Sequence, residues 1–254
     1  MHIDVHGSGP DLVLIHGWAM HGGIFAPLLP LLAAHFRVHV VDLPGHGYSA
    51  GGEPIDLLSC ARHIAARTPR ALWVGWSFGG LVSLQAALAV ADQVCGIVEI
   101  AASPKFVAAA DWPAGVPAEV FTQFGAGLLA DYRGTIERFL ALETLGSTEG
   151  KDELRALKAH VFERGEPSLD VLEQGLEVLQ ATDLRAELPR LAMPSCWVAG
   201  RRDRLVPAPA MRWSAAQSPH ARYVEIASGH APFLSHAGEV AAAITTFAMQ
   251  DAPA

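Results

Sequence analysis

Six short segments of the chain are apolar at nearly every position and are bounded by Gly, Pro or Asp. Strands that are buried on both faces have this continuous pattern, whereas strands with one exposed face alternate between apolar and polar positions. The pattern therefore predicts a mostly parallel sheet that is covered on both sides. The predicted strands are residues 12–16, 38–42, 72–76, 96–101, 196–199 and 223–226.

Stretches with a helical spacing of apolar residues lie between these segments. Residues 24–34 follow the first predicted strand, and residues 79–90 follow the third. Strands that alternate with helices in this way are typical of a doubly wound α/β fold. We expect that fold class for this chain.

The middle of the chain has a different pattern. No strand is predicted in residues 106–185, where Leu, Val and Phe recur at helical spacing and Gly and Pro separate the runs. We interpret this part as a helical lid, inserted into an α/β core that consists of residues 1–105 and 186–254. The predicted lid helices are residues 119–129, 132–145, 152–162 and 168–180.

Composition narrows the class of protein. The chain has 254 residues, of which 51% are hydrophobic and 17% charged, so it can bury a large core and is not a disordered chain. Its formal net charge of -8 has the wrong sign for non-specific binding of nucleic acid. No apolar run reaches the roughly 18 residues that span a bilayer, and the N-terminus lacks a secretory pattern. We expect a cytoplasmic monomer that binds neither nucleic acid nor a membrane.

The strongest chemical signal is the segment Gly75-Trp76-Ser77-Phe78-Gly79. It matches the pattern G-x-S-x-G and lies between a predicted strand and a predicted helix. A sharp turn there holds the serine in a strained conformation, and the flanking glycines leave room for the turn. We predict that Ser77 is a nucleophile. The alternative is an incidental serine in a glycine-rich turn.

A serine hydroxyl needs a base that takes its proton, and in this fold the order along the chain is Ser, acid, His. His230 follows the last predicted strand and is the predicted base. His236 is its nearest rival. His16 and His46 precede the serine in glycine-flanked turns, so we expect them to shape loops through hydrogen bonds to the backbone.

The predicted acid is Asp203, which follows the strand predicted at residues 196–199 and would fix the tautomer of the imidazole. The alternative is a solvated carboxylate among three arginines. Asp183 and Asp42 are rivals, and for Asp42 a structural role in the following turn fits better. The oxyanion of the reaction needs N–H donors, which we predict to be the backbone groups of Phe78 and Trp18. The Trp18 indole could also form a wall of the substrate pocket.

We predict neither a cofactor nor a metal. Residues 45–50 match the dinucleotide pattern G-x-G-x-x-A, but Pro44 precedes the first glycine, and Gly51, Gly52 and Pro54 follow where a helix would have to begin. The histidines near the first predicted strand lack the spacing of a helical metal pair. The cysteines are widely spaced, which predicts buried free thiols rather than a disulfide or a zinc site: Cys60, Cys95 and Cys196.

Taken together, these motifs resemble those of α/β-hydrolases, and the resemblance covers the whole chain. They are HGW at 16–18, DLPGHG at 42–47, GWSFGG at 75–80, GRRD at 200–203 and GHAPF at 229–233. Within that fold the chain closely resembles the BioH-type carboxylesterases, which are the pimeloyl-acyl-carrier-protein methyl ester esterases of biotin synthesis. The similarity extends into the predicted lid at residues 137–146, 155–158 and 170–172.

The resemblance implies hydrolysis of the methyl ester of pimeloyl-acyl-carrier protein, which leaves the free acid on the carrier and releases methanol. It also implies that basic lid residues bind the acidic carrier protein. By position, it places the following residues at the substrate: Trp18, Ser77, Phe78, Phe139, Leu140, Ala141, Leu142, Glu143 and His230.

The sequence itself gives carrier binding only part of its basis. Lys151, Arg155 and Lys158 stand at i, i+4 and i+7, so they share one helix face, and Arg138 could extend this basic stripe. Residues 133–164 also hold six acidic residues, so the alternative is a solvated helix with mixed charges.

Three other functions remain open on the same fold. They are a broad short-chain carboxylesterase or lactonase, an acyltransferase, and a non-catalytic ligand receptor. An intact set of Ser, Asp and His argues against the receptor, because a pure binder needs no activated serine. Turnover of p-nitrophenyl esters, compared with a carrier-bound methyl ester, separates the broad esterase from the implied activity.

Overall fold

The computed structural model describes residues 1–49, 51 and 55–252 of the chain. Ala50, the last residue of the stretch that matches the dinucleotide pattern, therefore lies outside the described residues, as do Gly52 and Pro54 after it.

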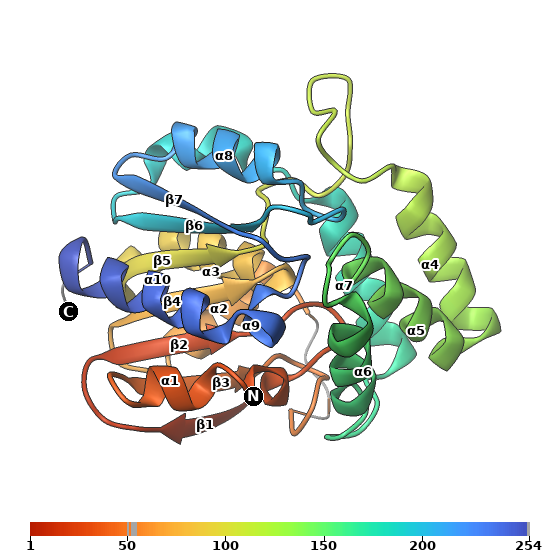
Figure 1. Cartoon of the computed structure of the whole chain (residues 1–254), viewed down its shortest axis with the longest axis horizontal. Helices are drawn as coiled ribbons and strands as arrows, with labels where there is room; N and C mark the ends of the chain where they lie inside the picture. The colour runs from red at the N-terminus through yellow and green to blue at the C-terminus, as the bar shows by residue number, and fades with distance from the viewer. Residues whose placement is uncertain (50, 52–54, 253–254) are drawn as a thin grey trace.

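Within the described residues, seven strands form one sheet in the order β1-β3-β2-β4-β5-β6-β7 (Figure 1). Neighbouring strands are parallel except for β1, which pairs with β3 in the antiparallel direction. The strands are β1 (His2–His6), β2 (Asp11–Ile15), β3 (Arg37–Asp42), β4 (Ala71–Trp76), β5 (Val94–Ile100), β6 (Ser195–Gly200) and β7 (Ala221–Ile226).

The six predicted strands are all present, and their ends lie within two residues of the predicted ones. β1 is missing from the prediction because it is only half-buried and carries histidine and aspartate, so it lacks a continuous apolar pattern. β4, β5 and β6, in contrast, are buried at every position, as expected for central strands of a sheet covered on both faces.

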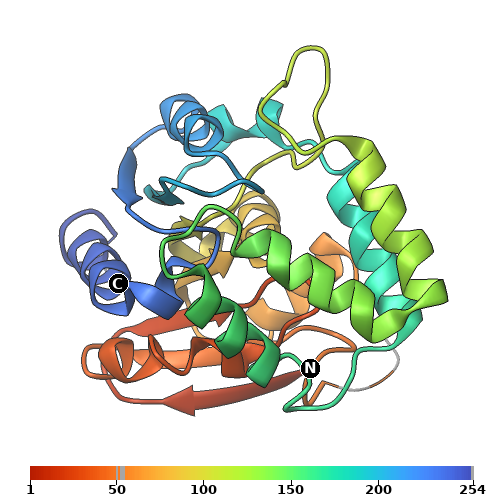
Figure 2. The ribbon, with the colours of Figure 1, turned by 45° about the vertical axis from the view of Figure 1, so that its right-hand side comes forward.

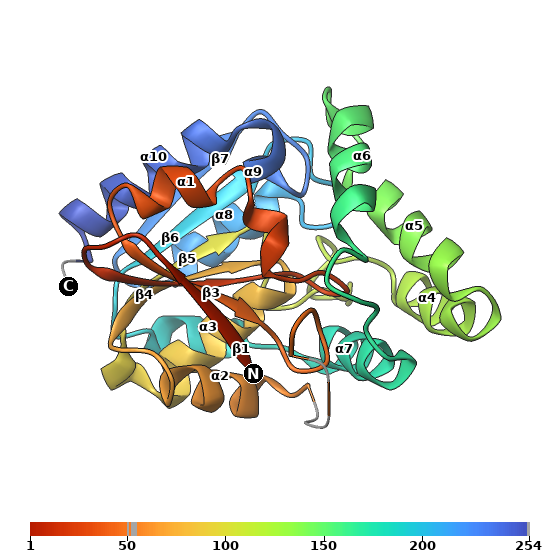
Figure 3. The ribbon, with the colours of Figure 1, turned by 90° about the horizontal axis from the view of Figure 1, so that it is seen from below.

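Helices cover both faces of the sheet. α1 (Leu29–Ala33) and α10 (Ala237–Gln250) pack together on one face, and α2 (Leu57–Ala65) and α3 (Phe78–Ala89) pack together on the other (Figure 3). α8 (Ala208–Gln217) packs against β6 and β7. The remaining short helices are η1 (Gly22–Phe25), η2 (Ala91–Gln93), η3 (Arg185–Arg190) and α9 (Pro232–Ser235).

The prediction of one helix over residues 24–34 is wrong. The segment consists of the 3-10 helix η1 and the short helix α1, with a break between them. Pro27 lies in the break and has no N–H to donate to the preceding turn, while Pro30 occupies the first turn of α1, where that missing donor does no harm.

Four α-helices lie between β5 and the 3-10 helix η3 in the sequence, and they gather at one end of the sheet, on the right of Figure 1. They are α4 (Ala118–Ala130), α5 (Tyr132–Glu143), α6 (Gly150–His160) and α7 (Leu169–Ala181), which agree with the four helices predicted there. α4 packs against α5 and α7 (Figure 2). We keep the name lid for residues 106–185.

Candidate active site

Ser77 occupies the sharp turn between β4 and α3. Its φ of 54° and ψ of -115° lie in a region that side chains other than glycine rarely adopt. The turn is this tight because glycines flank it: a Cβ atom on Gly75 would lie 2.3 Å from the carbonyl oxygen of Gly79, and one on Gly79 would lie 2.3 Å from that of Ile15. The two glycines of the pattern thus permit the tight turn that holds the Ser77 hydroxyl at the end of β4.

The substitution Gly75→Ala is expected to destabilise the protein by about 3 kcal/mol, because the new methyl group would meet backbone atoms that cannot rotate away. The expected fall in melting temperature is on the order of 10 °C, measured by circular dichroism. Gly125→Ala is the matched control, since a Cβ there lies 4.0 Å from the nearest side-chain atom, and it should leave stability unchanged or slightly higher. Equal melting temperatures for the two variants would contradict this account of the turn.

His230 reaches Ser77 from the loop that follows β7. Its Nε2 atom lies 2.9 Å from the Ser77 Oγ, and its Nδ1 atom lies 2.8 Å from Oδ2 of Asp203. The Trp76 indole N–H donates to the backbone carbonyl of His230 at 2.9 Å, which fixes the loop from below. The imidazole is fully buried.

Asp203 lies just beyond β6 and is also buried. Its Oδ1 atom accepts the backbone N–H groups of Leu205 and Val206 at 2.8 and 2.9 Å, so Oδ2 is the oxygen that faces His230. The alternative of a solvated carboxylate among arginines is therefore wrong. The three residues predicted from the sequence meet in one hydrogen-bonded chain from carboxylate to hydroxyl.

The electrostatics of this chain favour a basic imidazole. Burial alone would lower the pKa of His230, but the charge and hydrogen bond of Asp203, together with the carboxyl of Glu143, raise that pKa above its ordinary value. With the proton of the neutral imidazole on Nδ1, where Asp203 accepts it, the lone pair of Nε2 faces Ser77. The arrangement can therefore accept the serine proton.

The other residues considered as base or acid have hydrogen-bond partners other than Ser77 and His230. His236 contacts the Ser235 hydroxyl through Nδ1, and Asp183 pairs with Lys105 and Arg185. His16 accepts the Leu43 N–H at 2.9 Å. The contact of His16 with the backbone agrees with the loop-shaping role expected for it.

His46 also acts on the backbone, because its Nδ1 lies 3.0 Å from the carbonyl oxygen of Pro44. Burial lowers the pKa of His46 to about 4 and that of His16 to about 3, with a further contribution to the latter from the charge of His46. Both rings are therefore neutral at pH 7 and serve as fixed hydrogen-bonding groups.

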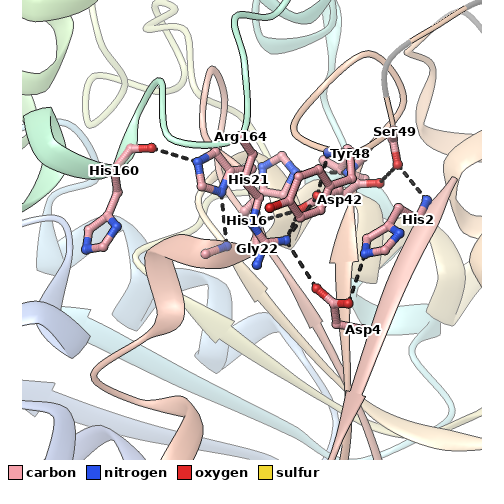
Figure 4. A network of polar contacts seen from close by, with 12 residues as sticks. His2, Asp4, His16, His21, Gly22, Asp42, Tyr48, Ser49, His160 and Arg164 are labelled. Carbon is pink, nitrogen blue, oxygen red and sulfur yellow. Dashed lines mark hydrogen bonds and ion pairs between the residues drawn. The ribbon is translucent and has the colours of Figure 1, made fainter.

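Asp42 is the centre of a polar network between the core and the lid (Figure 4). Its two oxygens accept the N–H groups of Gly22 and Tyr48, and Arg164 of the lid pairs with it at 3.2 Å. Burial opposes the charge of Asp42, but His16, these backbone donors and Arg164 hold its pKa below the ordinary value. The carboxylate thus joins the loop after β2, the turn after β3 and the segment after α6.

Two further contacts strengthen this connection (Figure 4). Arg164 lies over the Tyr48 ring, 4.7 Å from its centroid, and also pairs with Asp4 on the edge strand. His21 donates through Nε2 to the carbonyl of His160 at the end of α6, at 2.7 Å. The lid is therefore anchored to the core at this corner by charged and neutral contacts together.

Trp18 extends from the loop after β2 into the lid. Its indole N–H donates to the Leu172 carbonyl of α7 at 3.0 Å, and its ring meets Phe139 of α5 edge-on with centroids 4.7 Å apart. A Cβ on Gly175 would lie 2.6 Å from the indole.

Phe78 is buried at the start of α3, where the first N–H groups of a helix have no partner within the helix.

The segment that the resemblance places at the substrate has a mixed environment. Phe139, Leu140 and Glu143 are buried, Leu142 is half-buried, and Ala141 is exposed. Phe139 also contacts Phe124 of α4. Phe139, Leu140 and Glu143 therefore face the interior, whereas Ala141 faces solvent.

The candidate carrier-binding residues lie on exposed surface of α5 and α6. Arg155 pairs with Asp152 at 2.9 Å, Lys158 with Glu137 at 2.5 Å, and Arg138 with Asp131 at 3.3 Å. Three of the four basic side chains thus have acidic partners in the lid. This agrees with the mixed-charge alternative as far as local pairing goes.

Two contacts of the site were missed by sequence reasoning. The backbone N–H of His230 donates to the Glu143 carbonyl at 3.3 Å, and Arg164 reaches Asp42 across 122 positions of sequence. A signal existed for Glu143, which continues the buried face of Ile136 and Leu140 at helical spacing. Nothing in the sequence pairs Arg164 with Asp42.

The described residues contain no group of three or more His, Cys, Asp or Glu side chains that could hold a metal. The three cysteines are buried, as predicted, and no disulfide joins them in the part of the chain that the structure describes. No helix in the described part of the chain has the length and apolar character needed to cross a membrane.

Fold and sequence together define the class of protein. A family model described as the alpha/beta hydrolase family matches residues 12–243. The crystal structure of the enol-lactonase from Burkholderia xenovorans LB400 superposes with a TM-score of 0.85 at 20% identity, covering 98% of this chain and 96% of that one. The chain belongs to the alpha/beta hydrolase family, and the predicted fold class is confirmed.

More similar relatives narrow the assignment. The pimeloyl-[acyl-carrier protein] methyl ester esterase of Xanthomonas axonopodis pv. citri is 56% identical over 249 residues, which cover 97% of this chain and 98% of that protein. The protein of the same name from Stenotrophomonas maltophilia is 53% identical over 256 residues, which cover 100% and 98%. The chain belongs to the family of these esterases, as its motifs indicated, and it is a carboxylic ester hydrolase.

Proposed function

We propose that the protein hydrolyses the methyl ester of a pimeloyl chain carried on acyl-carrier protein, a step of biotin synthesis, by way of an acyl-enzyme on Ser77. The observation that carries the chemistry is the unbroken hydrogen-bonded chain from Asp203 through His230 to Ser77. The substrate is supported by the names of relatives that match this chain over nearly their whole length.

In the first step, His230 Nε2 takes the proton of the Ser77 hydroxyl while Oγ attacks the ester carbonyl. Asp203 holds the other ring nitrogen and stabilises the imidazolium that forms. The tetrahedral intermediate then collapses, the bond to the methoxy oxygen breaks, and His230 returns the proton to it. Methanol leaves, and the acyl group stays on Ser77.

In the second step, water replaces the serine hydroxyl in the same sequence. His230 takes a proton from the water, whose oxygen attacks the acyl carbonyl, and the proton then returns to the Ser77 Oγ. The products are the free carboxylic acid and the resting enzyme. In both steps the N–H groups of Phe78 and Trp18 are the proposed donors to the oxyanion.

The substrate needs an apolar path between its reacting end and its carrier. A groove of about 560 Å³ borders the end of α5 and is lined mainly by apolar side chains, among them Leu142, Leu145 and Leu205. The groove lies close to the proposed catalytic residues, because the N–H of Leu205 donates to Asp203 and Leu142 is followed by Glu143, whose carbonyl accepts the N–H of His230. We assign the methylene chain to this groove, with Phe139 and Trp18 as further walls.

The proposed docking surface for the carrier is the face of α6 that bears Lys151, Arg155 and Lys158. An acidic partner would compete with the local acids for these cations. The double charge reversal K151E/R155E is therefore expected to raise KM for a carrier-bound ester about ten-fold, because each exposed pair contributes up to roughly 1 kcal/mol. The change should shrink as salt is added.

The control for charge reversal is R62E/R70E, which makes the same change at two exposed arginines outside the lid. Both double variants should hydrolyse p-nitrophenyl butyrate at the wild-type rate, because this substrate has no carrier. Equal KM values for the carrier-bound ester in the two variants would rule out docking on this face of α6.

The experiment that tests the substrate is methanol release from methyl-pimeloyl-acyl-carrier protein, compared with turnover of p-nitrophenyl butyrate. The gene should also rescue a biotin-requiring strain that lacks its own esterase, whereas the Ser77→Ala variant should not. Hydrolysis of the p-nitrophenyl ester without methanol release or rescue would leave a broad short-chain carboxylesterase as the function.

A further inference from the structure

Glu143 is a buried carboxyl group beside the proposed catalytic residues. It ends α5, and only 2% of its surface is exposed. Its backbone carbonyl accepts the N–H of His230 at 3.3 Å, while its side-chain Oε2 has no hydrogen-bond partner among the described residues. The backbone of Glu143 is therefore held against the His230 loop, while one oxygen of its buried carboxyl group has no hydrogen bond in the described structure.

Several charged groups surround Glu143 from different elements. His230 and Asp203, from the loops after β7 and β6, both interact with it electrostatically. From α6, Glu153 approaches Gly229 from another side: a Cβ on Gly229 would lie 3.4 Å from the Glu143 carbonyl oxygen and 3.6 Å from Oε2 of Glu153. Glu153 is itself buried and accepts the hydroxyl of Ser235.

Two arginines lie next to the turn that follows α5. A Cβ on Gly146 would lie 2.8 Å from the Arg202 carbonyl oxygen and 3.5 Å from the Arg204 Nε. Arg202 is engaged with Thr148. No described residue forms an ion pair with Glu143, so its charge has only the His230 imidazole as a possible cationic neighbour within the site.

These surroundings set the charge of the group. Burial raises the pKa of Glu143 to about 8, with His230 acting to lower it and Asp203 to raise it. The carboxyl is therefore mainly neutral at pH 7 and loses its proton to solvent as the pH rises past 8. An anion at that position would stabilise a positive charge on His230.

We propose that Glu143 is a positioning residue for His230: its carbonyl holds the histidine loop, and its carboxyl makes the imidazole a stronger base in alkaline solution. The proposal rests on His230 acting as the base of the proposed function. His230 becomes an imidazolium as it takes the proton of Ser77, so an added negative charge beside it lowers the barrier to that step. The loss of a proton from Glu143 therefore assists the reaction, in addition to the loss of a proton from His230.

The test is the pH dependence of kcat/KM for p-nitrophenyl butyrate in the wild type and in Glu143→Gln. Glutamine keeps the size and the backbone carbonyl but cannot ionise. The ratio of wild-type to variant activity should grow about ten-fold between pH 6.5 and pH 9, with a midpoint near 8. A ratio that stays constant over this range, whatever its size, would overturn the proposal.

Glu99→Gln is the matched control. Glu99 is fully buried in β5, where it accepts the Ser83 hydroxyl, and burial raises its pKa well above the ordinary value. The Glu99→Gln variant therefore loses a buried carboxyl group by the same substitution as Glu143→Gln. Its pH profile should follow that of the wild type.

A second measurement needs no variant. The imidazole nitrogen resonances of His230 in the wild-type protein should show a second inflection near pH 8, when Glu143 ionises. A single inflection would overturn the proposal even if Glu143→Gln fails to fold. Because the p-nitrophenyl ester requires no carrier, the pH-profile test is independent of the substrate assignment. Loss of activity in Asp203→Asn, in which the imidazole can no longer accept the Ser77 proton, tests the base separately.

Discussion

Replacement of Ser77 by alanine is expected to lower kcat for p-nitrophenyl butyrate by a factor on the order of 10⁶, to near the rate in buffer. The hydroxyl oxygen is the atom that forms the acyl-enzyme, and the Ser77 Oγ lies 2.9 Å from His230 Nε2, which is placed to take its proton. Alanine removes that oxygen and leaves the turn and its glycine neighbours intact. Stopped assays with purified protein would measure the loss.

The fold should survive this substitution, because the side chain is small and alanine fits the same space. Circular dichroism should give a melting temperature close to that of the wild type. Ser83→Ala is the control: Ser83 is buried in α3, the helix that follows Ser77, and its hydroxyl is bonded to Gly80 and Glu99 rather than to His230, so most activity should remain. A Ser77→Ala enzyme with more than about one hundredth of wild-type turnover would show that another group is the nucleophile.

Asp203→Asn is expected to lower kcat by about 10⁴-fold. The reason lies in the partners of the two oxygens. Because Oδ1 accepts two backbone N–H groups, an asparagine would keep its carbonyl oxygen there and turn its amide N–H₂ toward His230. The imidazole would then carry its proton on Nε2 and could not accept one from Ser77.

The control for this variant is Asp183→Asn, since Asp183 is the rival acid and pairs with Lys105 and Arg185 in the lid connection. It should keep activity within about two-fold of the wild type, because exposed pairs contribute little. Nuclear magnetic resonance of the imidazole can report the tautomer directly. If Asp203→Asn kept more than a tenth of wild-type turnover, the proposed role of the carboxylate would be wrong.

Much of the fold follows from local patterns in the sequence. The central strands are apolar throughout because the sheet is covered on both faces, so their positions could be predicted to within two residues. β1 could not, because an edge strand that is half-buried shows no strong pattern. The helix expected over residues 24–34 failed because the apolar spacing outweighed Pro27 in the prediction.

The site was predictable where the fold fixes the order of its parts. Ser77 is marked by its glycines, and Asp203 and His230 follow strands whose ends meet at one edge of the sheet. The helical spacing indicated that Glu143 is buried, but its contact with His230 and the contact of Arg164 with Asp42 were not predictable, because they depend on how the lid packs on the core. Packing between segments far apart in the sequence leaves no periodic signal in either segment.

The position of Trp18 limits how this enzyme could be re-engineered. The residue belongs to the core, yet its indole is held by the Leu172 carbonyl and occupies the space where a side chain at Gly175 would have to be. A chimera that carried the helical segment of a distant hydrolase would need a carbonyl and a glycine at those two places. Without them, the core tryptophan would be displaced, and the loop that bears it would be displaced with it.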